Sequence, residues 1–315
     1  MLRRPLKIVI LGAGVQGTVF AVRLTMAGHQ VTLVSRAERA RQLNAGGAVI
    51  QDVTAFRTWT EHLPVLGRLP PDFAADMCLV TVRREQIESV LPDLAQATAI
   101  PRIVFMVNHA HGSQQLLTLL GRSRVVLAFP GVAGAREDNT VRYLDIPQQH
   151  TAVEAEAHDV VSLFRGAGFP VDTVADMDAW LQRHAVFITA MAGALYENEG
   201  DALRLARNRI TLRRLVVGVR EGWAAQDRKQ LRPAPFALRA IMCWVPLWLA
   251  ARYWSRLLAS DRGELYFAKH TRHAPAEMTA LANDVRGFLR QGEAPELQSL
   301  LASIEGWTHS ARGPN

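Results

Sequence analysis

The chain has few of the features that mark secreted, fibrous or repeat proteins. Only two cysteines occur among 315 residues, and they form no CxxC pair and no disulfide framework, which fits a reducing cytoplasm. Both of them, Cys78 and Cys243, lie in apolar runs, so we expect two small buried hydrophobic residues. Internal repeats and low-complexity segments are also missing from the sequence, which argues against a solenoid or a collagen-like protein.

Long hydrophobic runs are absent as well. The apolar stretch at residues 8–11 ends at Gly12 and does not form the core of a signal peptide. The most apolar later segment, residues 236–254, is interrupted by Arg239, Pro246 and Arg252, so it falls short of a membrane span. We expect a buried or interfacial helix pair there, and an amphipathic contact with a membrane stays open.

The charge is positive but not arranged for nucleic acid. The net charge is +7 and the pI is about 10.1, yet no block of five or more Lys and Arg residues and no zinc-finger spacing occurs. We interpret the excess as solvated surface that also receives an anionic cofactor and a small anionic or carbonyl substrate. Nucleic acid is not expected as a partner.

Two patterns divide the chain near residue 174. Before it, β-branched runs alternate with helical patterns such as residues 15–27 and 85–96, which predicts βαβ units and a mostly parallel sheet. After it, residues 178–307 show only helical periods. The sequence predicts an α/β Rossmann-type domain over residues 1–174 and an all-α domain over 175–315 for substrate binding or dimerisation. The predicted strands are residues 7–11, 30–35, 77–82, 102–107, 124–129, 142–146, 151–155 and 170–174, with a further helix over 156–166. The predicted helix breaks are Gly200, Pro233, Pro235, Gly263, Pro275 and residues 292–295.

A glycine-rich turn follows the first predicted strand. It reads G-x-G-x-x-G and is followed by a helical pattern, which is the context that a dinucleotide site needs. The first glycine allows a tight turn, the second lets the backbone approach a pyrophosphate, and the third lets the helix pack closely on the strand. The helix N-terminus then faces the phosphates. The residues of this predicted cofactor site are Gly12, Ala13, Gly14, Val15, Gln16 and Gly17.

The end of the second predicted strand distinguishes NAD from NADP. NAD sites carry an acidic residue there for the ribose hydroxyls, whereas this strand ends in Ser35 and Arg36, with Glu38 two residues late. An arginine fork suits the 2′-phosphate of NADP. We therefore predict NADP as the cofactor, with Arg36 as an ordinary surface residue being the alternative.

With these motifs the chain resembles the ketopantoate reductase (2-dehydropantoate 2-reductase) family over nearly its whole length. The resemblance implies a Rossmann domain, a helical domain similar to the C-terminal domain of 6-phosphogluconate dehydrogenase-like proteins, and a site in the cleft between them. It also implies that Arg83 stands where the family has a lysine near the cofactor, and that Asn108 contacts cofactor and substrate. The segments that carry the resemblance are residues 12–17, 75–83, Gln86, residues 103–108, residues 168–170, Trp180 and residues 276–278.

One predicted helix departs from the family pattern. Counted from Trp180, the family's catalytic lysine and its two asparagines correspond to Gln182, Val186 and Ala190. A glutamine amide cannot act as a general acid near neutral pH. The proton donor is therefore unassigned, with His184 and His109 as candidates.

Each candidate also has a plain structural explanation. His184 shares an apolar helix face with Trp180, so it is either a hydrogen-bonded core histidine or a donor. His109 and His111 follow a parallel strand, where ligands bind, but they also suit an exposed loop, and no third metal ligand is apparent. Glu277 either binds a substrate hydroxyl, as the resemblance implies, or simply complements a helix N-terminus. The basic cluster Lys269, His270, Arg272 and His273 either receives an anionic substrate or is solvated.

These observations favour an NADP(H)-dependent oxidoreductase that transfers a hydride to a 2-oxo acid or a related carbonyl. Two alternatives stay open. One is a non-catalytic NADP-binding sensor or partner protein. The other is a reductase of a bulkier apolar ketone or imine, in which Val186 and Ala190 enlarge the cleft and tryptophans line it, unless those tryptophans pack in the core. The tryptophans concerned are Trp244, Trp248 and Trp254. From the resemblance we also expect a homodimer.

Overall fold

The structure, a computed structural model, describes residues 4–227 and 236–310. The chain forms two compact units. The first contains residues up to 107 together with 113–177, and the second contains residues 108–112 together with 178 onward. The predicted fold class, an α/β Rossmann-type part followed by helices, is confirmed. The domain limits at 174 and 175 stay a prediction.

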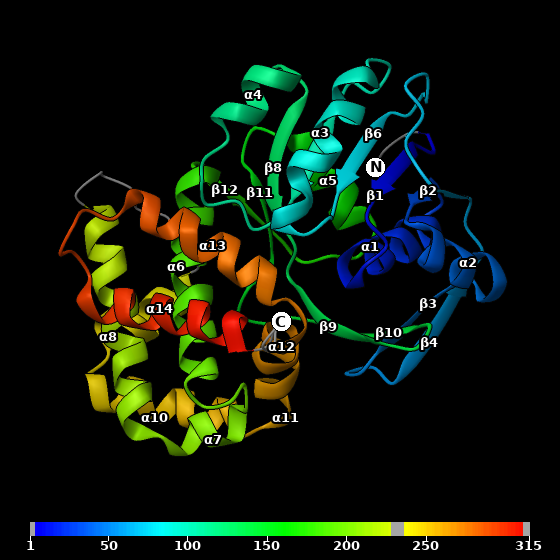
Figure 1. Ribbon diagram of the computed structural model, residues 1–315. Coiled ribbons are helices and arrows are strands. Elements are labelled where there is room, and N and C mark those ends of the chain that lie inside the picture. Colours follow the sequence, from blue (N-terminus) through cyan, green and yellow to red (C-terminus); the bar gives the residue numbers. More distant parts are fainter. Residues whose placement is uncertain (1–3, 228–235, 311–315) are drawn as a thin grey trace. The chain divides into compact units, whose positions relative to one another are not determined.

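The first unit is built on an eight-stranded sheet of order β12-β11-β8-β7-β6-β1-β2-β5. All its pairings are parallel except β11 with β8. Helices α1 and α5 share one face, where Phe20 and Phe164 make an edge-to-face contact at 5.1 Å. Helices α3 and α4 lie side by side on the other face (Figure 1). The strands are β1 (Lys7–Leu11), β2 (Gln30–Val34), β5 (Val65–Leu66), β6 (Met77–Val80), β7 (Ile103–Met106), β8 (Val125–Phe129), β11 (Thr151–Glu154) and β12 (Val171–Val174). The helices are α1 (Val15–Met26), α2 (Ala37–Gly46), α3 (Ile87–Gln96), α4 (Gln114–Leu120) and α5 (His158–Gly166).

A second, four-stranded sheet of order β4-β3-β10-β9 packs against α1. It comprises β3 (Ala48–Asp52), β4 (Arg57–Glu61), β9 (Val132–Glu137) and β10 (Thr140–Asp145). The parallel pairing of β3 with β10 joins segments about ninety residues apart. The sequence pattern indicated only β10 among these strands, because β4 and β9 carry mostly polar or small residues on a half-exposed sheet.

The regular secondary structure in the described part of the second unit is helical. Helix α6 is largely buried, and the indole of Trp223 on α8 donates to its Arg183 carbonyl at 2.9 Å. The Asp201 carboxylate caps α7 by accepting from Leu203 and Arg204. The helices are α6 (Met177–Tyr196), α7 (Ala202–Arg207), α8 (Arg209–Asp227), α9 (Phe236–Arg239), α10 (Leu247–Leu258), α11 (Asp261–Gly263), α12 (Lys269–His273), α13 (Pro275–Phe288) and α14 (Pro295–Ser310), with π-helical turns η2 (Ala240–Trp244) and η3 (Glu264–Ala268). None of the helices in residues 4–227 and 236–310 has the length and hydrophobicity of a membrane span.

The sequence predictions for Gly263 and Cys243 are wrong. Gly263 does not break a helix, because the chain stays helical from Asp261 through His273. The glycine is needed for close packing instead, since a Cβ there would come within 3.0 Å of the Leu258 backbone. Cys243 is exposed, whereas Cys78 is buried as expected. The helix breaks at Pro233 and Pro235 lie outside the described residues.

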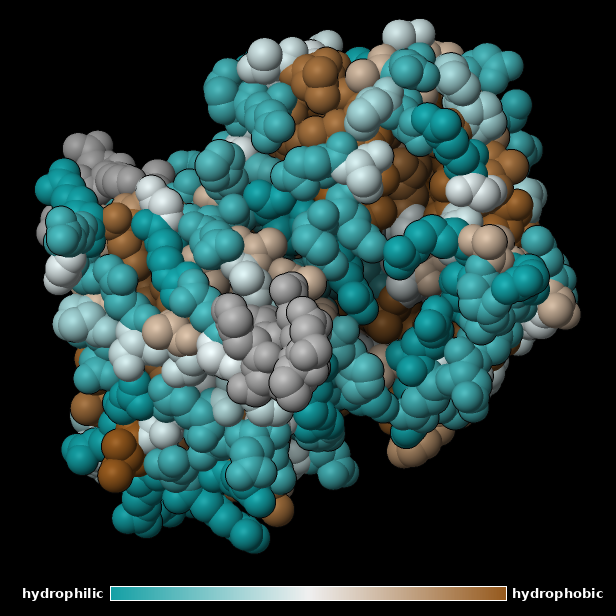
Figure 2. Space-filling view, in the orientation of Figure 1, coloured by the Kyte–Doolittle hydropathy of each residue, from teal (hydrophilic) through white to brown (hydrophobic). Residues whose placement is uncertain are grey.

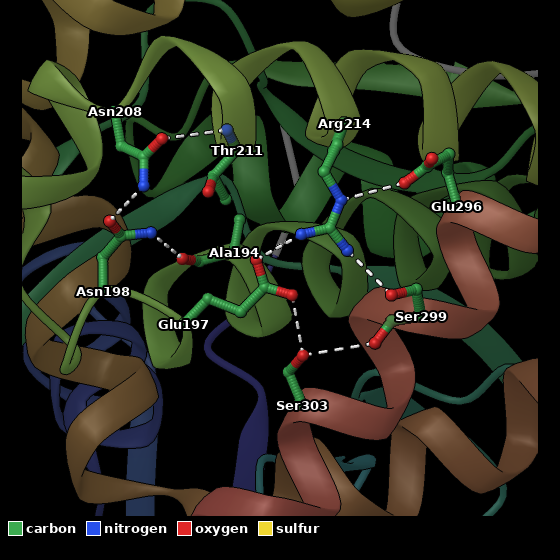
Figure 3. A network of polar contacts seen from close by, with 9 residues as sticks. All are labelled: Ala194, Glu197, Asn198, Asn208, Thr211, Arg214, Glu296, Ser299 and Ser303. Atoms are coloured by element: carbon green, nitrogen blue, oxygen red, sulfur yellow. Dashed lines mark hydrogen bonds and ion pairs between the residues drawn. The ribbon is translucent and has the colours of Figure 1, made fainter.

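A polar network joins the ends of α6, α8 and α14 (Figure 3). The Arg214 guanidinium of α8 donates to Glu197 at 2.7 Å, to Glu296 at 2.9 Å and to Ser299 at 2.7 Å. The Ser303 hydroxyl donates to the second oxygen of Glu197 at 2.8 Å. Because the planar guanidinium contacts two carboxylates and a hydroxyl at once, it fixes the register of three helices.

The contact between α6 and α14 predicts an effect on stability. A Cβ on Gly193 would overlap the carbonyl oxygen of Leu300, so Gly193→Ala should lower the free energy of unfolding by about 1–3 kcal/mol, as overpacked cores do. Gly287→Ala is the matched control, because that helical glycine is exposed and its Cβ would meet nothing within 4 Å. The control should gain up to about 1 kcal/mol from helix propensity. Urea unfolding followed by circular dichroism measures both, and equal stability of the two variants would contradict the packing assignment.

Candidate functional site

The glycine-rich turn lies at the point where the strand order of the large sheet reverses. Strand β1 pairs with β2 on one side and with β6 on the other, and the chain moves outward from β1 in both directions. Open α/β sheets bind ligands outside the carboxyl ends of their strands at such a point. Gly12, which follows β1, and Thr81, which follows β6, meet there: the Thr81 hydroxyl donates to the Gly12 carbonyl at 2.8 Å.

The three motif glycines have three different surroundings. Gly12 has a φ of +107°, which a residue with a side chain rarely adopts. A Cβ on Gly17 would overlap the Gly12 carbonyl oxygen, whereas a Cβ on Gly14 would meet no heavy atom within 4 Å. The open space at Gly14 is where the pyrophosphate of a dinucleotide would approach the backbone. The turn therefore fits the cofactor that the fold implies.

Helix α1 begins directly after this turn. Gly14 is its N-cap, and the first turn contains no acidic residue. The N–H groups of Val15, Gln16 and Gly17 have no carbonyl partner within the helix, and they lie at the positive end of the helix dipole. This terminus suits a phosphate group.

The end of β2 lies beside the glycine turn. Ser35 is buried, and Arg36 is exposed at the N-cap of α2. The Glu38 carboxylate binds Arg41 and accepts from Gln42 at 3.2 Å on the surface, and its pKa is lowered chiefly by the hydrogen bond with Arg41. Glu38 thus has both of its polar partners on its own helix.

A buried arginine next to the glycine turn was not singled out from the sequence. Arg39 is 7% exposed, and it donates to the Ala13 carbonyl at 3.4 Å and to Asn139 at 2.6 Å. Its Nη2 is buried without a hydrogen-bond partner in the described part of the chain. Burial, and then the nearby Arg136, lower the Arg39 pKa to about 10, so the side chain remains a cation at neutral pH. Such a buried donor without an anionic partner fits a phosphate group.

Arg83 follows β6 and is exposed. Its backbone N–H donates to the Gln86 side chain at 3.2 Å. Gln86 therefore has a local role in starting the η1 turn (Arg84–Gln86), while the Arg83 guanidinium lies at the same carboxyl edge of the sheet as Gly12 and Arg36.

The segment after β7 belongs to the second unit. Asn108 is partly buried, and its side-chain oxygen has no hydrogen-bond partner among the described residues. His109 is 3% exposed, so the expectation of an exposed loop is wrong for His109, although it holds for His111. His109 is thus held in a fixed environment beside Asn108.

His184 lies inside the helical unit. Its ring stacks on Trp180 with centroids 5.1 Å apart and lies 6.5 Å from Phe187. Burial lowers the His184 pKa to about 3, so the imidazole is neutral at physiological pH. A neutral, apolar-packed imidazole is a poor source of protons, and the core reading of His184 is the better supported.

The helix face that departs from the family pattern is packed rather than open. Val186 and Ala190 are fully buried, and a Cβ on Gly222 of α8 would touch Val186. Both side chains are therefore part of the packed core of the helical unit. Trp254 packs on Phe187 at 5.3 Å, but Trp244 and Trp248 are 60% and 63% exposed, so the expectation of core packing fails for these two. The alternative of a bulkier apolar ketone or imine stays a prediction.

Glu277 is buried at the N-terminus of α13. It is 6% exposed, follows Pro275 at the first helical position, and its Oε2 lies 3.4 Å from Nε2 of His270. His270 is half-exposed. The rest of the basic cluster is used locally, because Arg272 binds Glu264 and the Gly200 carbonyl, and His273 contacts the Lys269 carbonyl. The pairing of His270 with Glu277 was hidden in the sequence within a run of basic residues.

Two other kinds of site, a metal site and a pocket, have less support in the structure. Within the described ranges no group of three or more His, Cys, Asp and Glu side chains is arranged for a metal. A pocket of about 410 Å³ lies at the opposite end of α1 from the glycine turn. In its lining, Arg23 binds both oxygens of Asp145 at 2.9 and 3.0 Å and covers the Phe169 ring. The Asp52 carboxylate accepts from the backbone N–H groups of Thr54 and Ala55.

The glycine turn, the strand reversal and the helical second unit define the fold of nicotinamide-dependent oxidoreductases. Residues 8–155 match the family model described as Ketopantoate reductase PanE/ApbA. The resemblance seen in the sequence is confirmed there. A comparison with curated proteins finds no match.

Solved structures extend the similarity of fold to the whole chain. A PanE/ApbA family ketopantoate reductase from Ralstonia eutropha JMP134 is 17% identical, with a TM-score of 0.76 over 97% of this chain and 99% of that chain. A D-mandelate dehydrogenase, solved with NADH and anilino(oxo)acetate, is 12% identical, with a TM-score of 0.72 over 97% and 99%. A dimeric ketopantoate reductase from Staphylococcus aureus is 12% identical, with a TM-score of 0.70 over 97% and 99%. At these identities the similarity concerns the fold.

The burial of His184 predicts a dependence of stability on pH. Because its pKa falls from 6.5 to about 3 on folding, only the unfolded chain takes up the proton between these values, so stability falls as the pH drops below about 6.5. At pH 5.0 the loss should be about 2 kcal/mol relative to pH 7.5. Urea unfolding of the wild type and of His184→Phe at both pH values measures it. The variant should lose correspondingly less on acidification, and an equal loss would show that His184 is solvated.

Proposed function

We propose that the protein is an NADP(H)-dependent oxidoreductase that reduces a 2-oxo acid or a related small carbonyl compound. The observation that carries the proposal is the glycine turn, in which a Cβ would meet open space at Gly14 but would overlap the backbone at Gly17. The turn lies where the strand order of the sheet reverses, within the residues that match the ketopantoate reductase family model. Bound NADPH would supply a hydride to the carbonyl carbon of the substrate. The chain itself has to hold the cofactor, orient the substrate and manage one proton.

The cofactor contacts are proposed at the carboxyl edge of the large sheet. The backbone of Gly12–Gly17 holds the pyrophosphate, with Ala13, Val15 and Gln16 completing the turn. Ser35 and Arg36 bind the ribose 2′-phosphate, and the buried Arg39 adds a cation on the same side of the turn. Arg83 is a further phosphate contact. Three arginines without an acidic residue in the NAD position support NADP over NAD.

The substrate side is proposed to use Asn108 and Glu277. The Asn108 amide orients the substrate carbonyl, and its unsatisfied oxygen supports a role in binding. Glu277 binds a substrate hydroxyl or shares the proton that the new alcohol requires. His270, half in solvent and 3.4 Å from Glu277, can return that proton from water. His109 stays a candidate for a hydrogen bond to the carbonyl, and His184 is given no part in proton transfer.

The alternative function is a non-catalytic NADP-binding protein. It is favoured by one observation, the replacement of the family's lysine and asparagines by Gln182, Val186 and Ala190, two of which are core residues. Reduction of a carbonyl compound by NADPH would support the oxidoreductase, and NADPH binding without such reduction would support the non-catalytic protein.

The first test is NADPH oxidation, followed by absorbance, with ketopantoate and a panel of other 2-oxo acids. Glu277→Gln should lower kcat by about a hundredfold or more, the usual contribution of a general acid, while NADPH binding is retained. His273→Gln, in the same basic cluster but bonded to its own helix, is the control and should match the wild type. NADPH binding without turnover of any carbonyl would favour the sensor.

The second test separates the two roles of the motif glycines. Gly14→Ala places a methyl in open space, so it should leave the melting temperature of the free protein unchanged but weaken NADPH binding at least tenfold. Gly17→Ala should instead unfold the first unit, because its methyl overlaps Gly12. Calorimetric titration and thermal melts measure both. Full NADPH affinity in Gly14→Ala would exclude the glycine turn as the pyrophosphate site.

The same titration tests the choice of cofactor. Arg36→Ala should weaken NADPH binding more than NADH binding, since only NADPH carries the 2′-phosphate. An equal loss for both would remove Arg36 from the phosphate site.

A further inference from the structure

The exposed hydrophobic residues of the described chain are not scattered evenly. Of the nine large hydrophobic side chains that are exposed, four lie between residues 244 and 253. On the face of the helical unit seen in Figure 2, the most hydrophobic residues, drawn in brown, are isolated spots among hydrophilic ones. Contiguous apolar residues on a surface indicate a contact with another molecule. The four are Trp244 (60% exposed), Trp248 (63%), Leu249 (40%) and Tyr253 (36%).

Three of these residues share one side of α10, and Trp244 lies in the η2 turn that precedes the helix. Positions 248, 249, 252, 253 and 256 are exposed and recur at helical spacing, while Ala250, Ala251, Trp254 and Leu258 form the buried side. We call the exposed set the α10 face: Trp244, Trp248, Leu249, Arg252, Tyr253 and Arg256. Four of its six residues are aromatic or aliphatic, and two are basic.

The α10 face is held rigidly. Trp254 anchors the helix from beneath through Phe187 and Phe267. Arg220 of α8 donates to the Val245 carbonyl at 2.7 Å and so fixes the bend before Pro246. The Arg239 guanidinium lies 5.8 Å from the centre of the Trp244 ring. The exposed side chains are therefore presented by a packed scaffold rather than by a loose loop.

The charge of this region is one-sided. Residues 236–260, which the structure describes, contain three arginines and no acidic residue. On the α10 face, Arg252 and Arg256 are exposed, and neither is paired with a carboxylate in the part of the chain that the structure describes. A partner with a negative surface is the complementary one.

We propose that the α10 face docks the protein onto the surface of an anionic phospholipid membrane. Trp and Tyr rings favour the headgroup level of a bilayer, where one end is apolar and the other is wet. Arg side chains beside them bind lipid phosphates, and anionic lipids of the cytoplasmic leaflet attract such basic segments. The surface concerned is peripheral, since no described helix can span a membrane.

A second copy of the chain is the less suitable occupant. A two-fold interface on this face would bring the same arginines of both copies together without an acidic partner. The proposal does not depend on the oxidoreductase assignment.

Sedimentation with vesicles tests the proposal. Purified full-length protein is mixed with vesicles of phosphatidylcholine alone, or with about one third phosphatidylglycerol. We expect binding to the anionic vesicles that weakens as salt is added, and little binding to the neutral ones. Trp248→Ala, and the double variant Arg252→Glu/Arg256→Glu, should each bind at least tenfold more weakly at an unchanged melting temperature, because these side chains are exposed.

The control is Arg57→Glu/Arg122→Glu, which makes the same change in net charge at exposed positions of the first unit and should bind like the wild type. Equal weakening by both double variants would reduce the effect to overall charge and overturn the proposal. Absence of vesicle binding would also overturn it. Sedimentation velocity completes the test: a dimer that Trp248→Ala dissociates, without vesicle binding, would assign the face to a second copy instead.

Discussion

The first unit depends on the contact between the backbone of Gly17 and the carbonyl of Gly12. Only when no side chain stands between them can α1 begin within three residues of β1 and still lie flat on the sheet. That closeness brings the free N–H groups of the helix to the carboxyl edge of the strands. The anion binding that we propose for the site would therefore result from backbone packing, and the side chains around it would act on a scaffold already formed.

Parts of the structure that depend on local sequence patterns could be predicted, and parts that depend on distant contacts could not. Buried strands such as β1 and β6 carry continuous apolar runs, and the glycine turn has a fixed spacing, so both are visible locally. The small sheet was missed, apart from β10, because its strands are half exposed and pair across about ninety residues. The helical unit was predicted as a whole, but the exposure of Trp244 and Trp248 was not. A tryptophan in an apolar segment is expected to be buried, and only the packing of the folded chain shows that it is exposed.

The residues of the candidate site could likewise be predicted only where a local sequence pattern marks them. Gly12, Gly14 and Gly17 were identified because chemistry and spacing coincide. Arg39 was not, because in the sequence it is one of several arginines in a polar helix, and its burial against Ala13 arises only from the fold. The link between His270 and Glu277 likewise needs the bend between α12 and α13. Side chains that act through burial or through a turn of the backbone leave little trace in a single sequence.

The pairing of β3 with β10 has a consequence for how the chain comes to be folded. Strand β3 has a partner on both sides only after residues 140–143 have been synthesised, and the Arg39–Asn139 hydrogen bond that braces the glycine turn joins the same distant segments. During synthesis, the edge of β3 that pairs with β10 therefore stays unpaired until β10 has left the ribosome. Contacts this distant in sequence form slowly, and an open edge invites pairing with other chains. The nucleotide-binding half is thus the part of this protein for which assistance by chaperones would matter most during synthesis.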